Sequence, residues 1–233
     1  MTNVSPGTWA PAVSIDEVLD RMAGISESLP SEDGVATFNR MYSEVTRLVR
    51  AAVVAEEFAN AEFLERLDVH FANLFFDAYA ADRSGMPVSA AWEPLFESRL
   101  KPNTHPIQFA LAGMNAHISH DLPHAVVTTC REMALIPDDG TPEHGDFRRT
   151  NDVLDAATPE IKGWFVNGLV ARLDELGGRL DDGFAMFGIH VAREAAWECS
   201  EMLWRLQDDP RLDGLYRSAL ARGVQLTSRG ILL

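Results

Sequence analysis

The sequence lacks any long uninterrupted apolar run, and its first residues lack the marks of a secretory leader. Spanning a bilayer takes about 20 consecutive apolar residues, and no stretch of the 233-residue chain approaches that length. The opening stretch, residues 1–18, has neither a basic segment nor an apolar segment behind it. We therefore expect a cytoplasmic protein that neither spans nor binds a membrane.

Cysteine and basic residues are also scarce. The two cysteines, Cys130 and Cys199, lie outside any CxxC pattern, so the sequence indicates buried free thiols rather than a disulfide scaffold or a thiolate zinc site. Acidic residues outnumber basic ones by 35 to 20, which gives a formal net charge of -15. This charge repels phosphate backbones, and no local run of Lys or Arg offsets it, so we expect no nucleic-acid partner.

Several familiar catalytic motifs are missing. The sequence contains no GxSxG elbow, no GxxxxGK[ST] phosphate loop, no HExxH, and no strand followed by GxGxxG. We therefore expect no nucleotide cofactor.

Helical periodicity is what the sequence does have. Apolar residues recur at spacings of three and four, whereas strand-like alternation is rare. A composition of 46% hydrophobic and 24% charged residues suits one domain with a substantial core. The sequence thus predicts an all-α, single-domain helical bundle of about eight to ten helices. The domain would span residues 1–233, with an irregular N-terminal segment over residues 1–12.

Caps and turn residues divide the periodic segments. Ser14 followed by Glu17 predicts a capping box for a short first helix, and the break at residues 30–34 precedes a long helix from about Thr37. Proline lacks an N–H donor and clashes one turn back, so a helix over residues 107–133 should break or kink at Pro123. Further helices are expected near residues 60–82, 90–99, 146–156, 159–176, 181–206 and 209–222.

The strongest candidate site is a run of histidines around this kink. Offsets of three, four and seven residues share one helix face, so four candidate catalytic residues should converge: His117, His120, Asp121 and His124. Neighbouring imidazoles repel when protonated, so the cluster should keep its histidines neutral near pH 7, as a metal site or a general base requires. The alternative is a solvated helix face on which Asp121 merely caps the second helical piece.

A second candidate lies farther along the chain, where His190 and Glu194 are four residues apart. With His117 and Asp121 they would supply two histidines and two carboxylates from facing helices, a metal site for zinc, iron or manganese. A solvated charged stripe is the alternative. Three neighbouring side chains are candidate substrate-binding residues: Asn115, Arg193 and Trp197.

The remaining histidines are expected to lie outside the site. His70, on an otherwise apolar predicted helix, should be a hydrogen-bonded boundary residue, with a third-helix metal ligand as the lesser alternative. His105 and His144 fall in predicted loops beside proline or glycine, so both should face solvent.

Three segments carry a family resemblance: FNRMY at residues 38–42, LDVHFAN at residues 67–73 and AGMNAHISHDLP at residues 112–123. In them the sequence resembles a bacterial family defined as a domain of unknown function, most specifically in the string N-A-H-x-x-H-D-L-P. The resemblance implies a helical fold without an established activity. The His120-Asp121 dipeptide is also similar to HD-type metal sites, and HxxxD with a later HxxxE resembles the helical zinc phospholipase C and nuclease group.

Three functions follow as hypotheses. The first is a small-molecule enzyme, a hydrolase whose cluster holds one or two divalent metal ions while His120 shuttles protons. The second is a metal-independent acid/base cyclase or isomerase of specialised metabolism, with Trp92, Trp164 and Trp197 lining its pocket. The third is a non-catalytic binding or assembly protein with a structural histidine cluster. The sequence leaves the oligomeric state open.

Overall fold

The computed structural model describes residues 10–156 and 182–233, and within these ranges it contains helices and no strand. A helix also covers residues 142–156. The other elements are α1 (Ile15–Ser28), α2 (Gly34–Val54), α3 (Ala61–Arg83), α4 (Glu93–Ser98), α5 (Pro106–Ala116), the π-helical turn η1 (His117–Asp121), α6 (Leu122–Glu132), α8 (Asp182–Leu206) and α9 (Pro210–Ile231). The predicted all-α class is confirmed.

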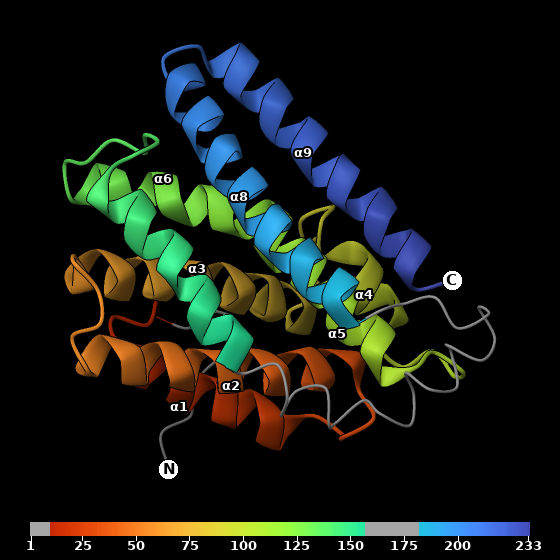
Figure 1. The fold of residues 1–233 in the computed structure, drawn as a ribbon. Coiled ribbons are helices and arrows are strands. Elements are labelled where there is room, and N and C mark those ends of the chain that lie inside the picture. Colours follow the sequence, from red (N-terminus) through yellow and green to blue (C-terminus); the bar gives the residue numbers. More distant parts are fainter. Residues whose placement is uncertain (1–9, 157–181) are drawn as a thin grey trace.

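The helices stack in three tiers around η1 (Figure 1). The first tier is α1 with α2. The second holds α3 and the continuous run of α5, η1 and α6. The third is the pair α8 and α9, which crosses the second tier obliquely. Because α3, α8 and α9 all pack against η1, this short turn lies at the centre of the molecule.

Side-chain caps fix the first helix starts. The Ser14 hydroxyl accepts a hydrogen bond from the Glu17 N–H at 3.2 Å, which confirms the Ser14 half of the predicted capping box, whereas the Glu17 carboxylate accepts from the Val13 N–H at 3.0 Å instead of from Ser14. The next helix, α2, begins three residues before the predicted Thr37. Its cap is Asp33, whose carboxylate accepts from the Val35 N–H at 2.8 Å and also pairs with Arg99. The loop before α2 is therefore shorter than the turn residues alone predicted, because Asp33 caps the helix.

The long helix predicted over residues 107–133 is present, and its interruption lies just before Pro123. In η1 the N–H of Leu122 bonds to the carbonyl of His117, five residues back. The wider π turn takes up one extra residue, and this relieves the clash that the ring of Pro123 would have with the carbonyl one turn earlier. Single π turns of this kind are frequent at functional sites.

Other boundaries differ from the predictions at segment ends. The helix expected from residue 146 begins at residue 142, where Pro142 occupies a first-turn position that needs no N–H donor. The last helix, α9, continues past Arg222 to Ile231, because Val224 and Ser228 bury against the rest of the fold. The helix predicted over residues 159–176, with Trp164, lies outside the described residues.

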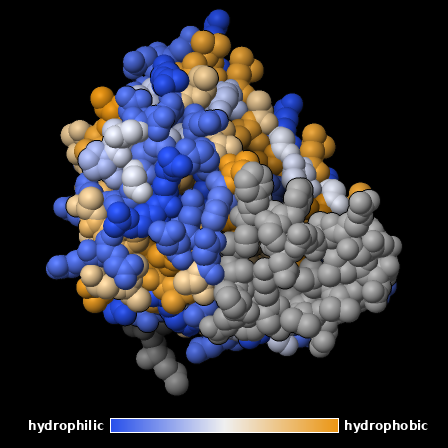
Figure 2. Space-filling view, in the orientation of Figure 1, coloured by the Kyte–Doolittle hydropathy of each residue, from blue (hydrophilic) through white to orange (hydrophobic). Residues whose placement is uncertain are grey.

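The surface is mostly hydrophilic on the face seen in Figure 2, and many of its apolar atoms lie along the upper right, over α8 and α9. Met202, Leu212 and Leu215 are among the exposed apolar residues of these two helices. Within the two described ranges, no helix is long and apolar enough to cross a bilayer.

Candidate functional site

The π turn and the start of α6 bring the four residues of the histidine cluster together. His117 and Asp121 are each 2% exposed, whereas His120 and His124 are half-buried. Neighbouring residues on an α-helix point apart, yet the side chains of His120 and Asp121 meet here. The wider π turn holds more residues per turn, so neighbouring side chains diverge less.

Asp121 is the centre of the site. Its Oδ1 accepts a hydrogen bond from His120 Nδ1 at 2.7 Å, and its Oδ2 accepts from His117 Nδ1 and from Trp92 Nε1, both at 3.0 Å. Burial favours a raised pKa, but the hydrogen bonds and charge of the two histidines outweigh it, so the pKa of Asp121 is lowered. The carboxylate is therefore ionised at neutral pH. An ionised carboxylate only accepts, so both imidazoles carry their proton on Nδ1 when neutral.

His117 sits in an aromatic box. Its ring stacks on Phe71 with centroids 3.5 Å apart and planes 7° apart, and Tyr42 meets it edge-on at 4.4 Å. Phe38 and Trp92 complete the box at 5.7 Å and 6.0 Å. Burial lowers the pKa of His117 against the pull of Asp121. The ring is thus neutral, and its buried Nε2 has no hydrogen-bond partner among the described residues.

His120 and His124 form the more accessible side of the cluster. Their ring centroids are 4.8 Å apart, and His124 Nδ1 donates to the carbonyl of His120 at 2.6 Å. Burial, followed by the charge of His120, lowers the pKa of His124 to about 4. The His120 side chain is 15% exposed, and the described part of the chain offers no hydrogen bond to its Nε2. Both rings therefore keep an Nε2 lone pair for another molecule.

Two residues that shape the site gave no signal of this role in the sequence. Trp92, expected as a pocket wall, instead donates to Asp121 from 29 positions away. Gly113 lets α5 approach α2, because a Cβ added there would lie 2.4 Å from the ring of Phe38. Phe38 in turn contacts the edge of His117.

The second candidate pair, His190 and Glu194, does not join the histidine cluster. His190 Nε2 lies 3.1 Å from Asp155 Oδ1, and Glu194 Oε1 lies 3.3 Å from His144 Nε2. The helix over residues 142–156 thus engages these two side chains of α8. Across residues 10–156 and 182–233, no group of three or more His, Cys, Asp or Glu side chains is placed to hold a metal ion. Of the predicted metal ligands, His117 and Asp121 are bonded to each other, whereas His190 and Glu194 face different partners on the helix over residues 142–156.

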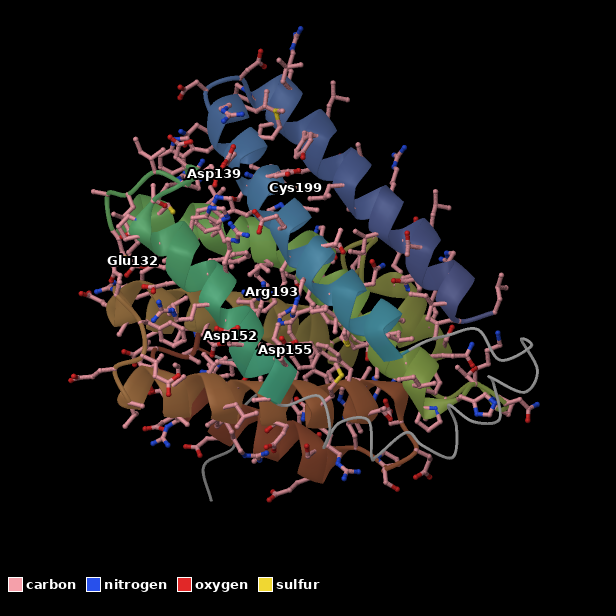
Figure 3. The ribbon with its side chains drawn as sticks, in the orientation of Figure 1. Glu132, Asp139, Asp152, Asp155, Arg193 and Cys199 are labelled. Atoms are coloured by element: carbon pink, nitrogen blue, oxygen red, sulfur yellow. The ribbon has the colours of Figure 1, made fainter. Side chains whose placement is uncertain are left out.

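Arg193, a candidate substrate-binding residue, is buried between helices. Figure 3 shows it on α8 near the helix that carries Asp152 and Asp155. Its guanidinium donates to Asn151 Oδ1 and to the carbonyl of Phe147, each at 2.8 Å, and lies 4.4 Å from the centroid of the Phe147 ring. Burial lowers its pKa to about 10. These contacts join two helices.

The other two candidate substrate-binding residues also join helices. Asn115 Nδ2 donates to the carbonyl of Val224 at 3.0 Å and to Ser228 Oγ at 2.9 Å, which ties α5 to α9. Trp197 is 1% exposed and stacks on His144 with centroids 4.7 Å apart. Their polar atoms are therefore directed at protein neighbours or buried.

His144 was expected in a solvent-facing loop, and that prediction is wrong. It is 3% exposed, and its Nδ1 lies 2.8 Å from Asp139 Oδ1. The helix begins at residue 142, so His144 belongs to its first turn and packs against α8. His70 is a half-buried boundary residue as predicted, with Nε2 2.5 Å from Glu132 Oε2. His105, also expected in solvent, is half-buried at the cap of α5.

Both cysteines are free, as predicted. Cys130 is buried, and Cys199 is half-buried rather than fully enclosed.

Comparison with known proteins gives a family and no function. A model described as a family of unknown function (DUF5995) matches residues 15–233, which include the whole histidine cluster. No curated protein and no solved structure matches the chain. The resemblance inferred from the sequence segments is thereby confirmed at the level of the family. The chain belongs to the family of unknown function DUF5995.

Proposed function

We propose that this protein is a cytoplasmic, metal-independent acid/base enzyme that acts on a small organic molecule, with His120 as its catalytic base. The observation that carries the proposal is the 2.7 Å hydrogen bond from His120 Nδ1 to Asp121 Oδ1. A carboxylate bound to one imidazole nitrogen fixes the tautomer and leaves the lone pair on the other nitrogen. The half-buried Nε2 of His120 is then the proton acceptor.

The surroundings of Asp121 support this role. Its charge is buried, and in the described ranges its partners are two imidazoles and an indole rather than a Lys or Arg. A permanent cation would neutralise the carboxylate, whereas a titratable imidazole can gain a proton beside it. When His120 takes a proton from substrate, Asp121 stabilises the imidazolium that forms. This arrangement favours proton transfer over a purely structural ion pair.

A base that can both remove a proton and return it indicates the class of reaction. His120 Nε2 removes a proton from a carbon beside a carbonyl, the C–H electron pair moves into an enolate, and the imidazolium returns the proton at another atom. Such a step serves an isomerase or a cyclase of specialised metabolism. His124, neutral and 4.8 Å away ring to ring, offers a second hydrogen-bonding group to the same substrate. The net charge of -15 favours a neutral or cationic substrate.

Solvent deuterium exchange tests the proposal without a known substrate. An enzyme that removes a carbon-bound proton catalyses its exchange in D₂O even when the full reaction stops there. A panel of ketones, aldehydes, thioesters and 1,3-dicarbonyl compounds would be followed by proton NMR. We expect the wild type to accelerate exchange for at least one compound class, and His120→Gln to lower that rate by about 10²- to 10⁴-fold.

The matched control is His70→Gln, since His70 is another half-buried histidine bound to a carboxylate but lies outside the cluster. It should keep the wild-type rate. Two results would contradict the proposal: full exchange activity in His120→Gln, or a wild type that exchanges no compound of the panel.

A further inference from the structure

Four buried polar atoms near His117 lack a well-aligned hydrogen-bond partner among the described residues. They are Tyr42 Oη, Thr46 Oγ1, Asp68 Oδ2 and His117 Nε2. Their residues are 5%, 0%, 9% and 2% exposed, respectively. Buried polar atoms in folded proteins almost always have a hydrogen-bond partner, from the protein or from ordered water, so these four require one.

The four atoms belong to one region between α2, α3 and η1. Tyr42 and Thr46 are one turn apart on the same face of α2. Asp68 lies one turn before Phe71 on α3, and the Phe71 ring stacks on His117. Tyr42 connects α2 to this region, because the centroid of its ring is 4.4 Å from that of His117 and 5.8 Å from that of Phe71.

Asp68 also contributes to the electrostatic environment of Tyr42. Burial first, and then the negative charges of Asp68 and Asp121, raise the pKa of the Tyr42 hydroxyl well above its ordinary value, and this rise outweighs the lowering effect of the nearby Thr46 hydroxyl, which lies within hydrogen-bonding range of Tyr42. Tyr42 is therefore near both carboxyl groups, one on α3 and one on η1.

We propose that Tyr42, Thr46, Asp68 and His117 line a buried site that holds ordered water, on the Nε2 side of His117. The donor and acceptor inventory fits this ligand. His117 Nε2 accepts, because Nδ1 donates to Asp121. The two hydroxyls both donate and accept, and the Asp68 carboxyl offers an acceptor oxygen. A buried water makes about three hydrogen bonds, so one or two waters satisfy all four atoms.

This water would also position the histidine cluster. A water that donates to His117 Nε2 stabilises the tautomer with the proton on Nδ1, and that proton is the one Asp121 accepts. The remaining oxygen of Asp121 holds His120. The contribution of the water site to catalysis rests on the proposed function, whereas the existence of the site does not.

A high-resolution crystal structure of the full chain, paired with ¹⁵N NMR of its histidines, tests the site. We expect density for at least one water within about 3.2 Å of two or more of the four atoms. Thr46→Val should displace that water and move the Nε2 resonance of His117. The matched control is Thr129→Val: Thr129 is also fully buried, but its hydroxyl already bonds to the carbonyl of Ala125 at 2.8 Å. The control should leave the resonance unchanged.

The proposal is overturned if His117 Nε2 and Asp68 Oδ2 each bond directly to another side chain with no water between them. It is equally overturned if Thr46→Val and Thr129→Val leave the His117 resonance in the same place. Neither result depends on activity, so each is distinguishable from a failure of His120 as a base. Should Thr46→Val not fold, Tyr42→Phe removes a different hydroxyl of the same site and carries the same expectation.

Discussion

Replacing Asp68 with Asn should stabilise the protein at neutral and alkaline pH and change little at pH 4. Asp68 is 9% exposed, and burial raises its pKa from the ordinary 3.8 to about 7. Between these values the unfolded chain releases the proton while the folded protein keeps it. The stability that the protonated side chain supports is therefore present below pH 4 and is lost as the pH rises toward 7.

The magnitude follows from the size of the shift. Each pKa unit corresponds to about 1.4 kcal/mol, so a shift from 3.8 to about 7 removes about 4 kcal/mol from the free energy of unfolding above pH 7. Asn has a similar shape and cannot ionise, so Asp68→Asn escapes this loss. The difference in unfolding free energy, variant minus wild type, should thus rise by up to about 4 kcal/mol between pH 4 and pH 8.

Urea unfolding followed by circular dichroism, at unit steps from pH 4 to pH 8, measures the difference curve. Thr129→Val is the control, because Thr129 is also fully buried but its hydroxyl bonds to the carbonyl of Ala125, outside the region around Asp68, and its removal takes away no ionisable group; its difference curve should be flat. A flat curve for Asp68→Asn would refute the reasoning, since it would mean that Asp68 ionises as readily in the folded protein as in the unfolded chain.

Three further predictions concern the cluster and its packing. Asp121→Asn should lower the free energy of unfolding, measured in urea at pH 7.5, by about 3 kcal/mol. The reason is that the hydrogen bonds from His117 and His120 to the charged carboxylate contribute about 1.5 kcal/mol each. A loss below about 1 kcal/mol would contradict this. Burial lowers the pKa of His124 from 6.5 to about 4, so the unfolded state alone takes up that proton and the wild type loses up to about 3 kcal/mol as the pH falls across this range. His124→Gln should show a shallower decline in the same titration, and an identical decline would argue against a buried neutral ring. Gly113→Ala should cost about 1–3 kcal/mol in thermal unfolding because its Cβ meets the ring of Phe38, whereas Gly24→Ala, with nothing within 4 Å, should gain up to about 1 kcal/mol; similar effects of the two would refute the close approach.

Local patterns in the sequence were enough to predict the helices and part of the candidate site. The segment predicted as a helix over residues 60–82 is α3 at Ala61–Arg83, because a long amphipathic stripe fixes both type and extent. The four-residue offset of His117 and Asp121 predicted a shared face, and the two side chains are buried and bonded to each other. Such features depend on neighbours a few residues away.

Features that depend on packing between distant segments were not accessible from spacing. Pro123 predicted an interruption of the helix, but it did not predict that the interruption would be a π turn that holds Asp121 between two imidazoles. The bond from Trp92 to Asp121 joins residues far apart in the chain. His144 became buried because a helix begins earlier than its turn residues suggested, and it engages Glu194 on α8.

The central claim is that Asp121 fixes His120 with its proton on Nδ1 and its lone pair on Nε2. Long-range ¹H–¹⁵N correlation spectra of the histidine rings at pH 8.5, where an ordinary imidazole is neutral, measure this directly. We predict that His120 shows a protonated Nδ1 and an unprotonated Nε2, and that Asp121→Asn abolishes this preference. A wild-type His120 with its proton on Nε2, or a tautomer unchanged by Asp121→Asn, would contradict the account.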